Sequence, residues 1–182
     1  YTNCTSVELW LNGVSPGKRE RKPFGKVHWE VPYEAGNLVA VRYDAKGEEQ
    51  IRRSIQTTGV AEKIELSLAS VGVEADGHAV AIINVAATDA EGRSVPTADN
   101  EVEFEVSESA VVLGVGNGNP TSHEPEQAPR RRLFNGAAQL IIRSTSTMGR
   151  IVVQAHTAGL ESDMLEIEVP DADLKITSIG AS

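Results

Sequence analysis

The side chains best suited to chemistry gather in one segment of this sequence, residues 116–132. Its 17 residues exceed the roughly 12–15 beyond which loops without secondary structure become uncommon and are often functional. The segment offers hydrogen-bonding groups that suit sugar hydroxyls or another protein surface, at Asn117, Asn119, Thr121, Ser122, His123 and Glu124. We predict that Asn117, Asn119, His123 and Glu124 contact a carbohydrate or a neighbouring domain. The alternative is a self-packed loop, because Asn and Ser commonly hydrogen-bond their own backbone.

Trp10 is the second candidate for a carbohydrate or interface contact. It alternates with Leu9 and Leu11, so it lies on the face of its expected strand opposite those apolar residues. An exposed indole there could stack on a pyranose ring, since it offers a rigid apolar face. The alternative is burial at a domain interface or in a two-faced core, which the high average burial of Trp favours.

The spacing of the remaining polar residues indicates no catalytic, metal or cofactor site. No nucleophile–base pair is visible, and residues 114–116 begin a dinucleotide fingerprint without a following helix. The histidines are scattered without ligand spacing, at His28, His78, His123 and His156. The single cysteine, Cys4, can form neither an internal disulfide nor a cysteine-based zinc site. We therefore expect no catalytic residue, no metal and no cofactor.

Charge and composition limit the kinds of molecule that this chain is expected to bind. The chain has 182 residues and a formal net charge of −9. Residues 1–60 carry nine Lys/Arg against seven Asp/Glu, and residues 61–182 carry eight against nineteen. An acidic surface repels phosphate backbones, which argues against nucleic acid, and no apolar run reaches the roughly 18 residues of a membrane span. The start at Tyr1, without Met or an apolar leader, predicts a fragment of a longer protein.

Hydrophobic alternation predicts strands throughout and no sustained helix. Expected strands lie at 7–11, 27–31, 39–43, 63–68, 80–88, 101–106, 111–115, 140–145, 150–155 and 164–169, with Gly-containing turns between them. The pattern predicts an all-β chain of two consecutive immunoglobulin-like β-sandwich domains. We place the first domain at 1–60, the second at 61–170 and a tail at 171–182.

Three side-chain placements follow from the same pattern. Trp29 alternates with Val27 and Val31 and is expected in the core of the first domain. The basic run at residues 18–22 is expected in an exposed hairpin or loop. The three arginines at 130–132 are expected beside the glutamate-rich face of the 101–106 strand.

Two stretches of the sequence resemble parts of a known enzyme family. Residues 7–13 (VELWLNG) and 29–38 (WEVPYEAGNL) resemble the small sandwich domain that follows the catalytic barrel in many bacterial β-galactosidases of glycoside hydrolase family 2. Residues 95–100 (VPTADN) and 114–125 (GVGNGNPTSHEP) look like the next, C-terminal domain of those enzymes, itself similar to bacterial immunoglobulin-like repeats. The two matches follow one another in the order that the family uses.

The resemblance implies a parent enzyme whose chemistry lies elsewhere. The family hydrolyses β-galactosides with retention, using two Glu carboxylates about 5–5.5 Å apart in the barrel. Asn100-Glu101 is similar to the family's Asn-Glu acid/base pair, but Glu101 opens an alternating strand and should face solvent. The chain is therefore expected to be no enzyme by itself, and to support the catalytic domains or oligomer contacts of a periplasmic or secreted parent. The alternative is a module that binds galactose-containing glycans.

Overall fold

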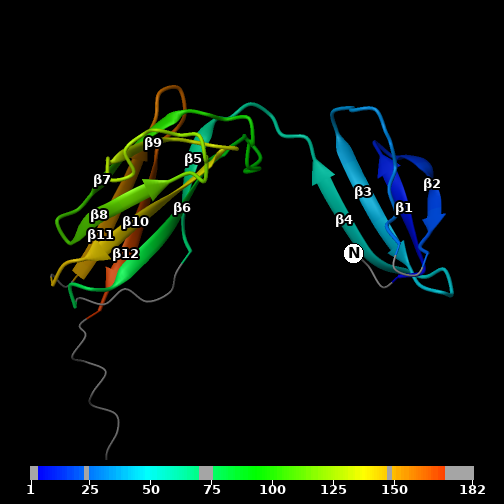
Figure 1. Cartoon of the computed structure of the whole chain (residues 1–182), viewed down its shortest axis with the longest axis horizontal. Coiled ribbons are helices and arrows are strands. Elements are labelled where there is room, and N and C mark those ends of the chain that lie inside the picture. Colours follow the sequence, from blue (N-terminus) through cyan, green and yellow to red (C-terminus); the bar gives the residue numbers. More distant parts are fainter. Residues whose placement is uncertain (1–3, 23–24, 70–75, 147–148, 171–182) are drawn as a thin grey trace, which may run out of the picture. The chain divides into compact units, whose positions relative to one another are not determined.

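The computed structural model describes residues 4–22, 25–69, 76–146 and 149–170. Within these ranges the chain forms strands joined by turns and loops, without a helix (Figure 1). It divides into two compact units, Tyr1–Thr57 (unit 1) and Thr58–Ser182 (unit 2). The all-β prediction is confirmed, while the expected tail at 171–182 lies outside the described residues.

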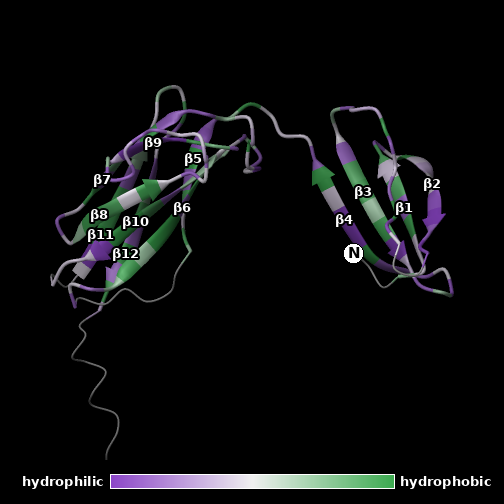
Figure 2. Cartoon of the chain, in the orientation of Figure 1, coloured by the Kyte–Doolittle hydropathy of each residue, from purple (hydrophilic) through white to green (hydrophobic). Residues whose placement is uncertain are grey.

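Unit 1 contains an antiparallel four-stranded sheet in the order β2-β1-β3-β4. Its strands are β1 (Ser6–Leu11), β2 (Val14–Glu20), β3 (Asn37–Tyr43) and β4 (Glu49–Gln56). The β1–β2 hairpin turns at Asn12-Gly13, where both residues have positive φ, the backbone that a tight Asn-Gly hairpin requires. Residues 18–20 of the basic run lie in β2, the exposed second strand of this hairpin, as predicted. Figure 2 shows β2 as largely hydrophilic.

The strand predicted at 27–31 is wrong. Residues 25–34 form no strand, and part of this segment lies against the sheet, where Val27 and Trp29 line a hollow with Val7 and Ala40. Alternation identified the side chains that face protein, but a strand also needs a ladder partner. Trp29 is consequently half-buried rather than in the core. Its indole N–H donates to the Gly17 carbonyl over 3.2 Å.

Unit 2 is a sandwich of two antiparallel four-stranded sheets. The first sheet has the order β5-β6-β10-β8 and the second β12-β11-β7-β9. The strand bounds are β5 (Lys63–Leu68), β6 (Val80–Thr88), β7 (Glu101–Val106), β8 (Ala110–Gly116), β9 (Arg130–Arg132), β10 (Ala137–Ser144), β11 (Gly149–His156) and β12 (Asp163–Val169). The sandwich prediction holds for this part of the chain.

Alternate residues of both sheets form the core of unit 2. The inward positions of the central strands are fully buried, including Ile83, Leu140, Ile142, Ile151 and Val153. Side chains on the two inner faces interdigitate in such a sandwich, and each buried aliphatic residue contributes roughly 1.5–3 kcal/mol. The edge strand β5 also holds the two sheets together, because its Leu66 N–H donates to the Asp163 carboxylate over 2.8 Å.

Candidate functional site

The predicted loop at 116–132 follows β8, returns along it and ends in β9. The Val115 N–H donates to the Glu126 carbonyl over 2.7 Å, and the Phe104 N–H to the Pro129 carbonyl over 2.8 Å. The second bond places the end of the loop beside β7. There Arg130 pairs in register with Glu103, so the expected approach of the arginine run to the glutamate-bearing strand is confirmed.

Arg131 is the residue around which this loop is built. It pairs in register with Val102, which is itself buried, and only 4% of Arg131 is exposed. Its Nη1 donates to the Glu124 carbonyl over 2.8 Å, and its Nε lies 3.5 Å from Oε2 of the same residue. Its Nη2 donates to Asn117 Oδ1 over 3.5 Å. Two predicted contact residues, Asn117 and Glu124, therefore bind a buried arginine of their own chain.

The other polar groups of the loop form a chain of short-range hydrogen bonds. Asn117 Nδ2 donates to the Arg132 carbonyl over 2.8 Å, while its Oδ1 accepts the Asn119 N–H over 3.0 Å. Asn119 Oδ1 accepts both the N–H and the hydroxyl of Thr121, at 3.0 and 2.9 Å. His123 is exposed. These bonds are those of the self-packed alternative, in which loop side chains satisfy loop backbone.

Sequence reasoning missed the central role of Arg131. Residues 130–133 alternate between exposed and buried, with Arg131 and Leu133 facing inward. This alternation in burial has no counterpart in residue type, because positions 130–132 are all arginine. Arginine is almost never fully buried unless it is paired, so three in a row indicate an exposed run.

Trp10 lies in unit 1, where the structure places it on β1 opposite Val39 of β3. It is half-buried and shares its sheet face with Glu8, whose carboxylate is well satisfied. The Ser15 hydroxyl donates to Glu8 Oε1 over 2.8 Å, and the Tyr43 hydroxyl to Oε2 over 2.9 Å. These two hydrogen bonds lower the pKa of Glu8, and the bond from Ser15 has the larger effect. Lys18 Nζ lies 3.7 Å from the centre of the Tyr43 ring, a cation–π contact.

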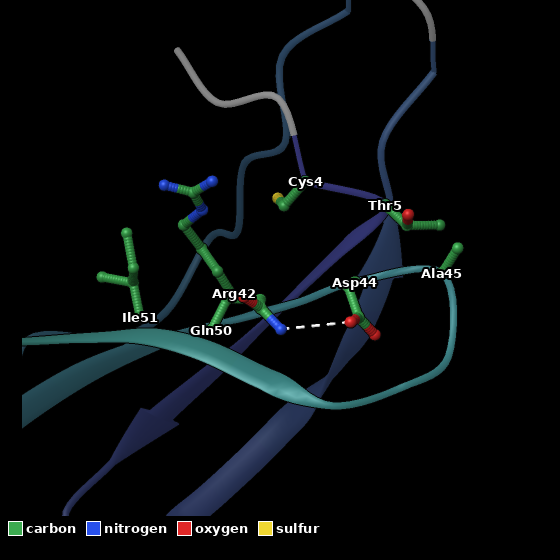
Figure 3. Close-up of a pocket in the computed structure, with 7 residues that line it drawn as sticks. All are labelled: Cys4, Thr5, Arg42, Asp44, Ala45, Gln50 and Ile51. Atoms are coloured by element: carbon green, nitrogen blue, oxygen red, sulfur yellow. Dashed lines mark hydrogen bonds between the residues drawn. The ribbon is translucent and has the colours of Figure 1, made fainter.

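A separate hollow of about 450 Å³ opens in unit 1, and Figure 3 shows the side chains that line it. Its polar lining includes Asp44, which accepts the Gln50 amide over 3.1 Å. The other oxygen of Asp44 accepts the N–H groups of Lys46 and Glu48, both at 2.9 Å. Asp44 therefore holds its own turn, and none of the predicted contact residues lines this hollow.

Comparison with known proteins shows the family to which unit 2 is related. Residues 64–166, more than half of the chain, match the model of glycoside hydrolase family 2 C-terminal domain 5. The chain belongs to this family. Residues 1–51 match a second model, a domain of unknown function designated DUF4982. The predicted membership in the C-terminal region of bacterial family 2 glycoside hydrolases is confirmed.

Relatives of this family 2 domain are long enzymes. The β-galactosidase BoGH2A of Bacteroides ovatus is 30% identical over 173 residues, covering 94% of this chain and 20% of that protein. A β-glucuronidase of Formosa agariphila is 31% identical over 173 residues, covering 88% of this chain and 16% of that protein. The chain thus spans about a fifth or less of the length of these relatives.

Solved structures of family 2 enzymes share the fold. A glycosyl hydrolase family 2 member from Bacteroides cellulosilyticus superposes with a TM-score of 0.87 at 37% identity, over 92% of this chain and 23% of that one. A β-glycosidase from Bacteroides vulgatus gives a TM-score of 0.84 at 34% identity, over 93% of this chain and 22% of that one.

Within the described ranges of this family 2 domain, no three His, Cys, Asp or Glu residues gather as metal ligands, and no helix is long and apolar enough to span a membrane.

Proposed function

We propose that this chain is a non-catalytic C-terminal part of a retaining β-galactosidase of glycoside hydrolase family 2, where it supports the catalytic barrel or contacts between subunits. The observation that carries the proposal is the alignment of nearly the whole chain with one fifth of a β-galactosidase. The β-glucuronidase relatives make a glucuronide the competing substrate of the parent.

The use of the acidic residues within the chain supports a non-catalytic role. A retaining glycosidase needs two carboxylates about 5–5.5 Å apart, one as nucleophile and one as acid/base. Glu101 lies on the exposed face of β7, while Glu8 and Glu124 are engaged by neighbouring side chains. Asp89, buried at the end of β6, accepts hydrogen bonds from Gly59 and Arg93. The carboxylates of Glu8, Glu124 and Asp89 therefore hold turns, a loop and a strand pair of the chain.

Binding of galactose-containing glycans is the second candidate, and Trp10 is the observation that favours it. Its indole is only partly buried and lies beside the Glu8–Tyr43 pair, a combination of aromatic and polar groups that suits a sugar. The loop contributes less support, because Asn117, Asn119 and Glu124 already satisfy partners within their own unit.

Hydrolysis assays test the principal proposal. We expect the parent enzyme to hydrolyse a chromogenic β-galactoside in preference to a β-glucuronide, and the 182-residue chain alone to hydrolyse neither. A parent lacking the segment that corresponds to this chain should lose thermal stability before it loses the chemistry itself. Turnover of either substrate by the isolated chain would contradict the proposal, and preferential cleavage of the glucuronide would overturn the β-galactosidase assignment.

A titration separates the scaffold from the glycan-binding module. For the scaffold we expect the tryptophan fluorescence of the chain to stay constant when galactose, lactose or galactan is added to millimolar concentration. A saturable change that disappears in Trp10→Ala and persists in a His123→Ala control would instead place a sugar on the β1–β3 face. Isothermal calorimetry on the same variants checks that a fluorescence change reports binding.

A further inference from the structure

The two outer faces of the unit 2 sandwich differ in chemistry. The outer face of β12-β11-β7-β9 is densely charged, with Glu101, Glu103, Glu105, Arg150, Glu166 and Glu168. Arg150 binds Glu166 over 2.7 Å and Glu168 over 2.9 Å across the β11–β12 pair. Such a surface is costly to desolvate, so this charged face is suited to water.

The outer face of the other sheet, here called the neutral face, has mainly apolar and small residues. Read from the strand registers across β5, β6, β10 and β8, its rows are Glu65, Ala86 and Ala137; Ser67, Asn84, Gln139 and Gly116; Ile82, Ile141 and Gly114; and Val80, Arg143 and Val111. Val80 and Val111 remain 43% and 45% exposed, and Leu113, at an irregular point of β8, is 38% exposed. Figure 2 shows β6 and β8 as largely apolar, with their inward and outward positions coloured alike. Exposed apolar residues that gather on one face of a domain often mark a contact site.

Gly116 gives a second, independent sign of a contact on the same face. It pairs with Gln139, which is exposed, so a side chain at Gly116 would also point outward. Its backbone is not in the left-handed region, and a Cβ added there would meet no atom within 4 Å. Gly116 is the last residue of β8, and a glycine in a strand often marks close approach by another backbone. Among the residues that the structure describes, no atom occupies the space that a Cβ at Gly116 would take.

We propose that the neutral face is covered by the remainder of the parent polypeptide, through a surface that is apolar and weakly charged. The inference rests on the proposed function and names the surface through which the chain would support its parent. This chain spans 20% of its β-galactosidase relative, so most of a parent of that length lies outside the structure. A nucleic acid would select Lys and Arg, and a glycan would select more hydrogen-bonding groups than Asn84 and Gln139, which bind each other over 3.0 Å.

Cysteine labelling measures this coverage directly. In a Cys4→Ala background, Val111→Cys places a thiol on the neutral face and Met164→Cys a matched thiol on the charged face, where Met164 is 52% exposed. Both variants are prepared in the 182-residue chain and in the parent enzyme, and their reaction with a bulky maleimide is timed. We expect Val111→Cys to react at least tenfold more slowly in the parent than in the chain, and Met164→Cys to react at rates within twofold of each other.

The other outcomes overturn the proposal in distinct ways. Equal rates for Val111→Cys in the two proteins would show that the parent leaves the face open. Slow labelling in the chain alone would show a second copy if the rate depends on concentration, and a segment of the chain itself if it does not. Hydrolysis of β-galactoside, assayed on the same parent samples, reports the proposed function separately, since labelling does not depend on which glycoside is cleaved.

A variant at Gly116 gives a second measurement. Gly116→Thr is expected to leave the melting temperature of the 182-residue chain unchanged or higher, because β-branched residues suit strands and the site is open. In the parent enzyme the same variant should lower the melting temperature, since its side chain would occupy the space of the neighbour. Equal effects in both proteins would contradict close approach at this glycine.

Discussion

Replacing Arg131 with alanine is expected to lower the free energy of unfolding of unit 2 by about 2–4 kcal/mol. The substitution removes the donor to the Glu124 carbonyl and the contacts with the Glu124 carboxylate and Asn117, and it leaves space where 96% of the residue surface had been buried. The loss stays below that of a fully buried ion pair, because the Glu124 side chain is 30% exposed and can hydrate. Urea denaturation of the 182-residue chain measures the change.

Two further variants separate the effect of the Arg131 guanidinium from the effects of its location in β9 and of its apolar side-chain carbons. Arg130→Ala, on the exposed neighbour in β9, should change stability by less than about 0.5 kcal/mol. Arg131→Met keeps an unbranched apolar side chain beside Val102, so it should recover part of the alanine loss. Hydrogen exchange should show faster opening of residues 117–128 in both Arg131 variants. Equal stability of Arg131→Ala and the natural sequence would mean that this arginine does not organise the loop.

The fold of unit 2 could be predicted closely because both of its sheets bury one face. The expected strands at 63–68, 80–88 and 101–106 coincide with β5, β6 and β7. In β5 and β7 apolar residues recur at every second position, a period that follows directly from the pleat, whereas β6 is a nearly continuous apolar run of strand length. The register between neighbouring strands could not be predicted from this period. The bulge where β8 pairs with β10 does not show in the pattern of apolar residues.

Unit 1 was harder to predict because several of its strands lack that pattern. All eight residues of β4 are exposed, and the strand contains more polar than apolar residues. Its place in the sheet is set by pairing with β3, a tertiary fact that local sequence does not contain. The reverse error occurred at 27–31, where a clean alternation packs against the sheet without joining it.

The polar residues of the loop could be predicted from the sequence, but their hydrogen-bond partners could not. Asn117, Asn119 and Glu124 are indeed the polar centre of the loop, yet their partners are Arg131, Arg132 and Thr121. Residue type alone cannot distinguish an amide that waits for a ligand from one that holds a turn, since both need the same donor and acceptor groups. The contacts of the buried Arg131 with Asn117 and Glu124 favour the second role, and local sequence does not reveal them.

Replacing Asp89 with asparagine is expected to lower the melting temperature of the chain at pH 7 by on the order of 5–10 °C. Asp89 is 1% exposed and directly follows β6, which ends at Thr88. Its Oδ1 accepts the N–H groups of Glu91 and Arg93 at 3.1 and 2.8 Å. Its Oδ2 accepts the Gly59 N–H and Arg93 Nε, both at 2.8 Å. Asparagine cannot present two acceptor oxygens, so one amide group would face these donors.

The same carboxylate makes stability depend on pH in a defined window. Burial alone would raise the pKa of Asp89, but hydrogen bonds from the Arg93 and Gly59 backbone and from the Arg93 guanidinium outweigh it, and the pKa falls from 3.8 to about 2. Because the folded pKa is below the unfolded one, the contribution is complete above about pH 4 and disappears as the pH falls toward 2. The stability difference between the natural chain and Asp89→Asn should therefore be constant from pH 7 to 5 and shrink between pH 4 and 2. Asp99→Asn, on an exposed residue, is the matched control for the substitution itself and should change stability at pH 7 by less than about 0.5 kcal/mol. A difference that stays constant down to pH 2 would mean that the charge of Asp89 contributes nothing, and that its loss acts through shape alone.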